Sequence, residues 1–218
     1  MTWVKLCSIK NPADIAVAVK ACPNAVGFLV GQKYSSSDFI PAKTARQLAA
    51  SLPLNITPVL VTHLSQANEI VTLIRETNIF TVQLHGDCPI DELIKLRSLI
   101  NEPLTLIYAV HVTGSGLSAN ISQLNPYVDM ILLDSCDSVL GKVGGTGLVH
   151  DWRISADIVL NSQLPIILAG GLTPENVSAA IQQVKPFGVD VNSGVKNKYG
   201  FRSHDLCNLF VERAKNRN

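Results

Sequence analysis

Two side chains near the amino terminus, Lys5 and Cys7, are of types that can do acid–base chemistry together. They lie in the stretch MTWVKLCSIK, and in a strand over residues 4–9 both point to one face, because strand side chains alternate with a period of two. An ammonium group beside a thiol favours the thiolate, so we expect Lys5 to lower the pKa of Cys7 and make a base available. A buried, unreactive thiol is the alternative for a cysteine taken alone.

Further polar side chains stand at the carboxyl ends of other apolar segments. They are Gln83, His85, Asp134, Asp190 and Asn192. Polar groups that point into an apolar core need partners, so these residues either hydrogen-bond one another and water or line a binding site. Their recurrence at several segment ends favours a site. For His85, which precedes a glycine, a role in orienting its loop is the preferred interpretation.

Three glycine-rich segments give a second chemical signal. LAGGL (168–172) leads into a helical pattern, and NSGV (192–195) ends the next strand pattern. Glycine lets backbone N–H groups approach a phosphate closely, and a helix amino terminus favours an anion. GKVGGTGLVHDW (141–152) does not have the spacing of a phosphate-binding P-loop, and we expect a lid there, with a plain flexible loop as the alternative.

The elements that must position these residues alternate along the chain in a βα pattern. Short apolar, β-branched runs predict eight strands, over residues 4–9, 25–30, 56–62, 81–86, 104–112, 130–135, 165–171 and 188–195. Amphipathic segments with Asp, Ser, Pro or Glu near their starts predict helices between them, over 11–22, 41–52, 64–77, 89–100, 151–162 and 173–184, with a weak one over 116–127 and a last one over 203–217. Eight such units without a linker indicate an α/β fold, a single-domain (β/α)8 TIM barrel over residues 1–218, rather than a doubly wound sheet. The active site of such a barrel lies at the carboxyl ends of its strands.

Composition excludes several kinds of partner. The 218 residues carry 18 basic and 17 acidic side chains, a net charge of +1, which predicts no binding to nucleic acid or to a membrane surface. No apolar run reaches the roughly 20 residues of a membrane span. Five cysteines without a CxxC pair or a signal peptide predict free thiols and a cytoplasmic location. A metal site of His85, His111, Cys88 and Cys136 is a minor alternative whose spacing fits no known ligand pattern, so we expect neither a metal nor another cofactor.

In series, the motifs resemble those of phosphoribosylanthranilate isomerase, an enzyme of tryptophan biosynthesis. They occur in the order of that family and cover nearly the whole chain: KLCSI, VQLHGD (82–87), LLDS (132–135), GGTG followed by DW (144–152), LAGGLTPENV (168–177) and GVDVNSGV (188–195). The resemblance implies a (β/α)8 barrel and an Amadori rearrangement of N-(5-phosphoribosyl)anthranilate into a 1-amino-1-deoxyketose phosphate.

The resemblance also implies roles for individual residues. It makes Cys7 the general base that takes the proton from C2 of the sugar, and Asp134 the general acid that protonates the furanose ring oxygen. A carboxyl group at a partly desolvated barrel mouth should keep its proton to higher pH, so we expect the pKa of Asp134 to be raised. The implied substrate- and phosphate-binding residues are Lys5, Gln83, Gly144, Gly145, Gly170, Gly171, Asp190, Ser193 and Gly194.

The sequence departs from the family pattern at the side of the site expected to hold anthranilate. Ser37 and Asp38 stand where the family has an arginine that engages the anthranilate carboxylate, and Lys33 in the same loop is a candidate substitute. Lys196 replaces the usual glutamate after Ser-Gly-Val, and Ser8 replaces the glycine after the cysteine. These departures keep two alternatives open: a related isomerase of a different phosphorylated sugar or amine, and a barrel that binds a phosphometabolite without catalysis. The pattern fits a monomer or a homodimer.

Overall fold

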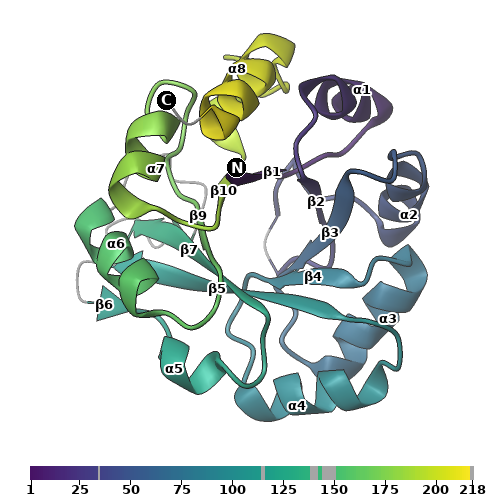
Figure 1. The fold of residues 1–218 in the computed structure, drawn as a ribbon. Coiled ribbons are helices and arrows are strands. Elements are labelled where there is room, and N and C mark those ends of the chain that lie inside the picture. Colours follow the sequence, from purple (N-terminus) through teal and green to yellow (C-terminus); the bar gives the residue numbers. More distant parts are fainter. Residues whose placement is uncertain (34, 114–115, 138–141, 144–150, 217–218) are drawn as a thin grey trace.

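The chain forms a closed barrel of parallel strands surrounded by helices (Figure 1), in a computed structural model that describes residues 1–33, 35–113, 116–137, 142–143 and 151–216. The barrel strands are β1 (Trp3–Leu6), β2 (Ala25–Leu29), β3 (Thr57–Thr62), β4 (Thr81–Leu84), β5 (Thr105–Thr113), β7 (Met130–Asp137), β9 (Ile166–Leu168) and β10 (Gly188–Val191). Each pairs in parallel with its neighbour, and pairing of β1 with β10 and of β5 with β7 closes the ring. This confirms the predicted barrel.

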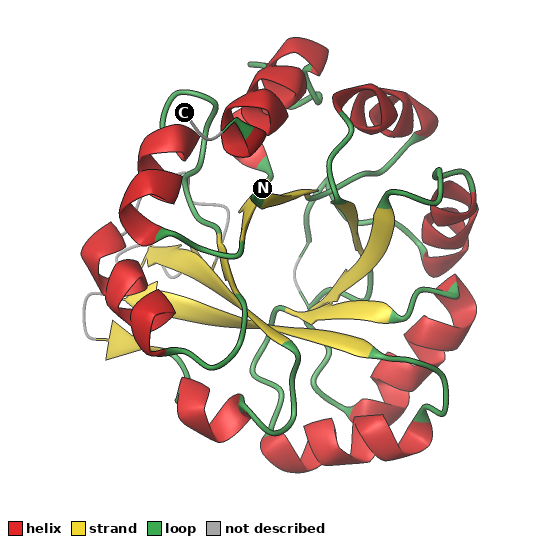
Figure 2. Cartoon of the chain, viewed as in Figure 1, coloured by secondary structure: helices red, strands yellow, loops and turns green. Residues whose placement is uncertain are grey.

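Helices follow the strands and cover the outside of the barrel (Figure 2). They are α1 (Pro12–Ala21), α2 (Ala42–Ala50), α3 (Ala67–Thr77), α4 (Ile90–Leu99), α5 (Ile121–Leu124), α6 (Trp152–Asn161), α7 (Val177–Val184) and α8 (His204–Lys215). Side-chain caps begin several of them: the Asn11 side chain accepts the N–H of Asp14 in α1, and the Ser203 side chain accepts that of Leu206 in α8. In the segment predicted to be the weakest helix, residues 116–127, the helix comprises only the four residues of α5. No described helix is long and apolar enough to cross a membrane.

Strand alternation produces two apolar layers. Outward-facing side chains such as Val4, Leu6 and Phe28 pack against the helices in the larger core, while the inward-facing layer fills the barrel. The inward layer consists of Cys7, Ala25, Val59, Val61, Ile107, Ala109, Leu132, Ile167 and Ala169. Small and branched side chains of this layer plug the barrel, so polar groups are confined to the ends of the strands, where the site is expected.

Two short strands extend the barrel at the carboxyl ends of β5 and β7. β6 (Gly116–Leu117) pairs antiparallel with β5, and β8 (Lys142–Val143) pairs antiparallel with β7. A three-residue 3-10 helix, η1 (Ser193–Val195), follows β10. The predicted strands over 165–171 and 188–195 therefore end earlier than expected, because their glycine-containing ends turn into loops at the mouth of the barrel.

Candidate active site

The predicted base, Cys7, directly follows β1 and lies in the inward layer of the barrel. Its backbone N–H donates to the carbonyl of Val191 at 2.9 Å, and its residue is only 7% exposed. The next residue, Ser8, has a φ of 69°, a left-handed conformation that turns the chain away from the strand direction. Gly27 on β2 faces the thiol so closely that an added Cβ would lie 2.8 Å from Cys7 Sγ. The sulfur is thus packed between two strands at the barrel mouth.

Lys5 lies on the same face as Cys7, as predicted, but its ammonium group is held by Asp190. Lys5 Nζ is 2.8 Å from Asp190 Oδ1, and Lys5 is fully buried. The register of β1 and β10 places these two residues opposite each other. Burial disfavours the Lys5 ammonium group, but the negative charges of Asp190 and the Cys7 thiolate outweigh it, so the pKa of Lys5 is raised. The sequence therefore placed Lys5 and Asp190 on the right face without indicating that they pair.

The expected lowering of the Cys7 pKa is wrong. Burial of the thiol penalises the thiolate and raises the pKa of Cys7, an effect that the charge of Lys5 reduces and that of Asp190 reinforces. Burial is the largest of these influences, and Asp190 offsets part of the charge of Lys5. Cys7 is therefore a thiol at neutral pH in the structure.

The predicted acid, Asp134, lies on β7 and contacts a histidine that the sequence interpretation had assigned to loop orientation. His85 Nε2 is 3.5 Å from Asp134 Oδ2, and the N–H of Ser135 donates to Asp134 Oδ1 at 2.8 Å. The amide nitrogen of Gln83, one pleat before His85, lies 2.9 Å from His85 Nδ1 and donates to it. That hydrogen bond leaves the proton of a neutral imidazole on Nε2, which faces Asp134.

The expected rise of the Asp134 pKa is also wrong. Burial acts to raise it, but the hydrogen bond and charge of His85, the charge of His111 and the N–H of Ser135 outweigh burial and lower the pKa. Asp134 is therefore a carboxylate at neutral pH. His85, Gln83 and Asp134 form one hydrogen-bonded group, and the alternation of Gln83 and His85 on one strand face is the signal that could have revealed it.

Three histidines line the same side of the mouth, from the ends of β3, β4 and β5. The ring centroids of His63 and His85 are 5.5 Å apart, and those of His85 and His111 are 5.3 Å apart, both in edge-to-face contact. His111 lies beside Asp134 in the register of β5 and β7. Burial and the neighbouring histidines lower the pKa of His63 to about 4 and lower that of His111. Both rings are thus neutral near pH 7, and each packs edge-to-face against His85 at one side of the barrel mouth.

The glycine loops after β9 and β10 meet at the mouth. Gly170 and Gly171 have φ values of 81° and 65°, and no hydrogen bond in the described part of the chain takes their N–H groups. In η1, the backbone at Gly194 approaches the carbonyl of Leu172 so closely that a Cβ would lie 1.9 Å from its oxygen. Ser193 begins η1 beside it. The free N–H groups of Gly170 and Gly171, beside the adjoining turn of η1, fit an anion. Gly144 and Gly145 lie outside the described residues.

Arg202, which the sequence analysis did not predict as a site residue, holds the backbone at Cys7 and Ser8. Its guanidinium is buried, and Nη2 donates to the backbone carbonyls of Cys7 and of Ser8, the latter at 3.2 Å. Its Nε and Nη1 atoms find no hydrogen-bond partner among the described residues. The guanidinium also lowers the pKa of Cys7 in part. An arginine just before a helix gave no sequence signal, because its partners are backbone carbonyls some 200 positions away in the chain.

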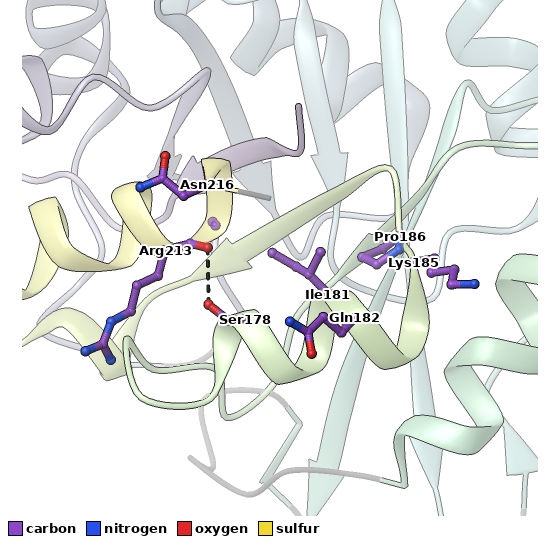
Figure 3. Close-up of a pocket in the computed structure, with 8 residues that line it drawn as sticks. Ser178, Ile181, Gln182, Lys185, Pro186, Arg213 and Asn216 are labelled. Atoms are coloured by element: carbon purple, nitrogen blue, oxygen red, sulfur yellow. Dashed lines mark hydrogen bonds between the residues drawn. The ribbon is translucent and has the colours of Figure 1, made fainter. Parts of the chain in front are cut away.

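A cavity elsewhere on the molecule does not contain the predicted residues. It has a volume of about 400 Å³, lies between α7 and α8 on the outside of the barrel (Figure 3), and is lined by residues such as Ile181, Lys185 and Arg213. The Ser178 hydroxyl donates to the carbonyl of Arg213 there at 3.2 Å. No group of three His, Cys, Asp or Glu within the described ranges is arranged to hold a metal ion.

The arrangement defines an acid–base enzyme of the (β/α)8-barrel class. A thiol and a carboxylate lie at the carboxyl ends of β1 and β7, each buried and each held by a second polar group, and glycine loops follow the last two strands.

Comparison with known proteins identifies the family within that class. A sequence model described as N-(5'-phosphoribosyl)anthranilate (PRA) isomerase matches residues 4–213. N-(5'-phosphoribosyl)anthranilate isomerase 2 of Methanosarcina mazei is 44% identical over 213 residues, covering 98% of this chain and 94% of that protein. The phosphoribosyl anthranilate isomerase structure from Thermotoga maritima is 31% identical with a TM-score of 0.81, covering 99% of both chains. The chain belongs to the N-(5'-phosphoribosyl)anthranilate isomerase family.

One of the similar structures contains a bound compound. It is a phosphoribosyl anthranilate isomerase in complex with reduced 1-(o-carboxyphenylamino)-1-deoxyribulose 5-phosphate, 30% identical with a TM-score of 0.79 and with 99% of both chains covered. That compound carries a phosphate and an aryl carboxylate.

Proposed function

We propose that this chain converts N-(5'-phosphoribosyl)anthranilate into 1-(o-carboxyphenylamino)-1-deoxyribulose 5-phosphate, with Cys7 as the general base and Asp134 as the general acid. The observation that carries the assignment is their placement: both belong to the inward face of the barrel, at the carboxyl ends of strands, and each is 7% exposed. Membership of the isomerase family supports the reaction, and the local chemistry supports the two roles.

The first step opens the sugar ring. Asp134 in its protonated form gives a proton to the furanose ring oxygen, the bond between C1 and that oxygen breaks, and the nitrogen lone pair forms an iminium. His85 Nε2, 3.5 Å from Asp134 Oδ2, orients the carboxyl group and relays a proton to it. Gln83, which donates to the other ring nitrogen, holds His85 in that orientation.

The second step moves the hydrogen of C2. The Cys7 thiolate takes the C2 proton, and the electrons of the C–H bond form an enolamine. Lys5, one pleat away, stabilises the thiolate while it exists, and Arg202 adds a second positive charge through the backbone side. Transfer of the enol proton to C1 then gives the ketoamine product.

The protonation states fit this sequence when both groups are counted together. At rest the site holds a thiol at Cys7 and a carboxylate at Asp134, as their shifted pKa values require. The reactive form, thiolate and carboxylic acid, contains the same number of protons. One turnover moves a proton from Asp134 to the substrate and another from the substrate to Cys7, which regenerates the resting form. The reactive fraction is therefore independent of pH between the two pKa values.

The remaining predicted residues divide between the ends of the substrate. Gly170, Gly171, Ser193 and Gly194 bind the phosphate through backbone N–H groups, which fits the adjoining loops and the free N–H groups of Gly170 and Gly171. Asp190, beside the base, contacts the ribose, and the fully buried Lys5 acts on the substrate side through its ion pair with Asp190. Gly144 and Gly145 are assigned to the substrate on the sequence motif alone.

A tryptophan auxotroph that lacks this isomerase tests the function. Wild-type chain should restore growth without tryptophan, whereas Cys7→Ala and Asp134→Asn should not, at equal protein levels. A wild-type protein that accumulates and folds without restoring growth would overturn the assignment to anthranilate. It would favour the second candidate, isomerisation of a different phosphorylated amine, which Asp38 in place of the family arginine suggests.

The free thiols support a cellular location for the enzyme, and a similar structure supports its oligomeric state. We place it in the cytoplasm, where Cys7, Cys22, Cys88 and Cys207, all free in the structure, stay reduced. It acts as a monomer or a homodimer, since the isomerase of Thermotoga maritima is described in both forms.

A further inference from the structure

Two departures from the family pattern, Asp38 and Lys196, contact each other in the structure. Lys196 Nζ is 2.5 Å from Asp38 Oδ2, and Lys10 Nζ is 3.5 Å from Asp38 Oδ1. We name Lys10, Asp38 and Lys196 the mouth cluster. Two ammonium groups share one carboxylate, whose lowered pKa keeps it ionised, so the cluster has a net charge of +1.

The mouth cluster joins the loop after β1 to the loop after β10. Lys10 follows Cys7 by three positions after β1, and Lys196 directly follows η1. Asn192, which directly follows β10, donates from Nδ2 to Asp38 Oδ2 at 3.3 Å and links the cluster to the loop of Ser193 and Gly194. The side chains of Lys10, Asp38 and Lys196 are 22%, 14% and 14% exposed, so all three border solvent at the mouth.

Within the described residues, both ammonium groups of the mouth cluster have more N–H donors than hydrogen-bond partners. Each lysine ammonium has three N–H donors. In the described part of the chain, Lys196 Nζ uses Asp38 alone, and Lys10 Nζ uses Asp38 and the carbonyl of Ser37. An incoming carboxylate can therefore be held by both lysines without displacing Asp38.

Other cations near the mouth are committed to different partners. Lys5 is paired with Asp190 inside the barrel, and Arg202 holds backbone carbonyls. Lys33, the substitute suggested by the sequence, donates to Ser65 Oγ at 3.4 Å and faces the loops after β3 and β4, where its charge acts on His63. Beside the base, Lys10 and Lys196 together carry one positive charge that Asp38 does not balance.

We propose that Lys196, assisted by Lys10, binds the aryl carboxylate of the substrate, and that Asp38 holds the two ammonium groups in position. The inference rests on the proposed function, because only an anthranilate-type substrate supplies that carboxylate. It assigns the recognition of the aromatic acid to Lys196 and Lys10, beside an Asp38–Lys196 ion pair whose polarity is the reverse of the arginine and glutamate of the family pattern.

Steady-state kinetics on two substrates test this assignment. The first substrate is N-(5'-phosphoribosyl)anthranilate, and the second is N-(5'-phosphoribosyl)aniline, which lacks only the carboxylate. Lys196→Met should raise KM for the anthranilate substrate about 10- to 100-fold, the loss of affinity expected when a charge-assisted hydrogen bond is removed. It should leave KM for the aniline substrate unchanged. Lys10→Met should have a smaller effect of the same kind. Lys33→Met is the matched control and should change neither KM.

Two further variants keep the test decisive. Asp38→Asn keeps a side-chain oxygen that can hold the ammonium groups in position but removes the competing negative charge. KM for the anthranilate substrate should therefore fall, while that for the aniline substrate stays constant. Asp38→Arg combined with Lys196→Glu should restore discrimination that Lys196→Glu alone destroys. Equal effects of Lys196→Met on both substrates, or none on either, would overturn the inference while the enzyme remains an isomerase. A wild type that turns over neither substrate would refute the proposed function, and the inference would fall with it.

Discussion

The ion pair of Lys5 and Asp190 gives the strongest prediction about stability. Lys5→Met removes the ammonium group 2.8 Å from Asp190 and leaves a carboxylate that is 8% exposed without its counter-charge. Breaking a buried pair from one side costs about 3–5 kcal/mol, because the remaining charge stays desolvated. Replacing both partners by apolar residues avoids that cost, so Lys5→Met combined with Asp190→Leu should be within about 2 kcal/mol of the wild type.

The pH dependence of the single variant has a defined sign. In the wild type, the folded pKa of Lys5 is raised above 10.5, so its stabilisation is fully present below that value and is lost as pH rises through the folded pKa. Lys5→Met lacks this group, so the wild type should exceed it in unfolding free energy by the same margin at pH 7 and pH 5. The margin should shrink as pH rises above 10.5, where the wild type begins to lose the charge of Lys5.

Urea unfolding provides the measurement. Trp3 lies in β1, two positions before Lys5, and stacks on Phe187 with a centroid distance of 6.2 Å, so its fluorescence reports on this end of the sheet. Unfolding curves of the wild type and both variants are recorded at pH 7 and pH 5. A loss below about 1 kcal/mol in Lys5→Met, or a double variant no more stable than the single, would refute the view that the pair is held by mutual neutralisation.

The double variant also separates stability from catalysis. It should fold, yet it lacks the cation that offsets burial of the Cys7 thiolate. Each further unit of Cys7 pKa reduces the thiolate about tenfold, so kcat should fall at least that much. KM should rise as well, because Asp190 no longer contacts the ribose. Asp190→Asn, which keeps Lys5, is the matched control. Unchanged kcat in the stable double variant would show that Lys5 serves the fold and not the base.

Three further outcomes follow from the site. The pH profile of kcat/KM, measured in buffers of constant ionic strength, should fall on the alkaline side only above the ordinary thiol pKa of 9.0, because the pKa of Cys7 is raised. On the acid side it should fall only below 3.8, because the pKa of Asp134 is lowered. A fall near pH 7 that depends on Cys7 would contradict the raised pKa. Arg202→Met should lower the free energy of unfolding by about 1–3 kcal/mol, measured by denaturation, and should move the alkaline fall of the pH profile to higher pH. Arg202→Lys should keep part of the stability and part of the pH effect. An alkaline fall that does not move would mean that Arg202 has a purely structural role. Gly27→Ala should reduce kcat more than it changes KM, because the new methyl group lies 2.8 Å from Cys7 Sγ; normal kcat would mean that the sulfur position is not critical.

The fold was predictable because local pattern and global architecture agree. Eight apolar runs, each followed by an amphipathic segment, could form parallel strands only through helical crossovers, and the chain has no linker to divide them. Strand ends were less predictable. Residues 169–171 and 192–195 continue the apolar pattern, but the positive φ of Gly170 and Gly171 and the turn at η1 end both strands early.

The site was predictable in its residues and not in their partners. Period-two alternation placed Lys5, Cys7 and Asp134 on the inward face, since orientation is a local property of a strand. The contacts that set their protonation join different strands: Asp190 reaches Lys5 from β10, and His85 reaches Asp134 from β4. Both pKa expectations failed for this reason. For Cys7, the charge of Asp190 opposes that of Lys5, so burial remains the largest influence on the thiol pKa. For Asp134, the desolvation of the carboxyl group is outweighed by His85, which is distant in sequence.

Charge balance explains how a nearly neutral chain can hold a strongly anionic substrate. The proposed substrate carries a phosphate and a carboxylate, whereas the whole chain has a net charge of only +1. Lys5 is neutralised by Asp190, which leaves the phosphate to uncharged backbone N–H groups at Gly170 and Gly171. The mouth cluster then keeps one unpaired ammonium beside the base. Each anionic group thus meets a local binding element instead of a general basic field, and this predicts association rates that depend only weakly on salt while KM responds to Lys196.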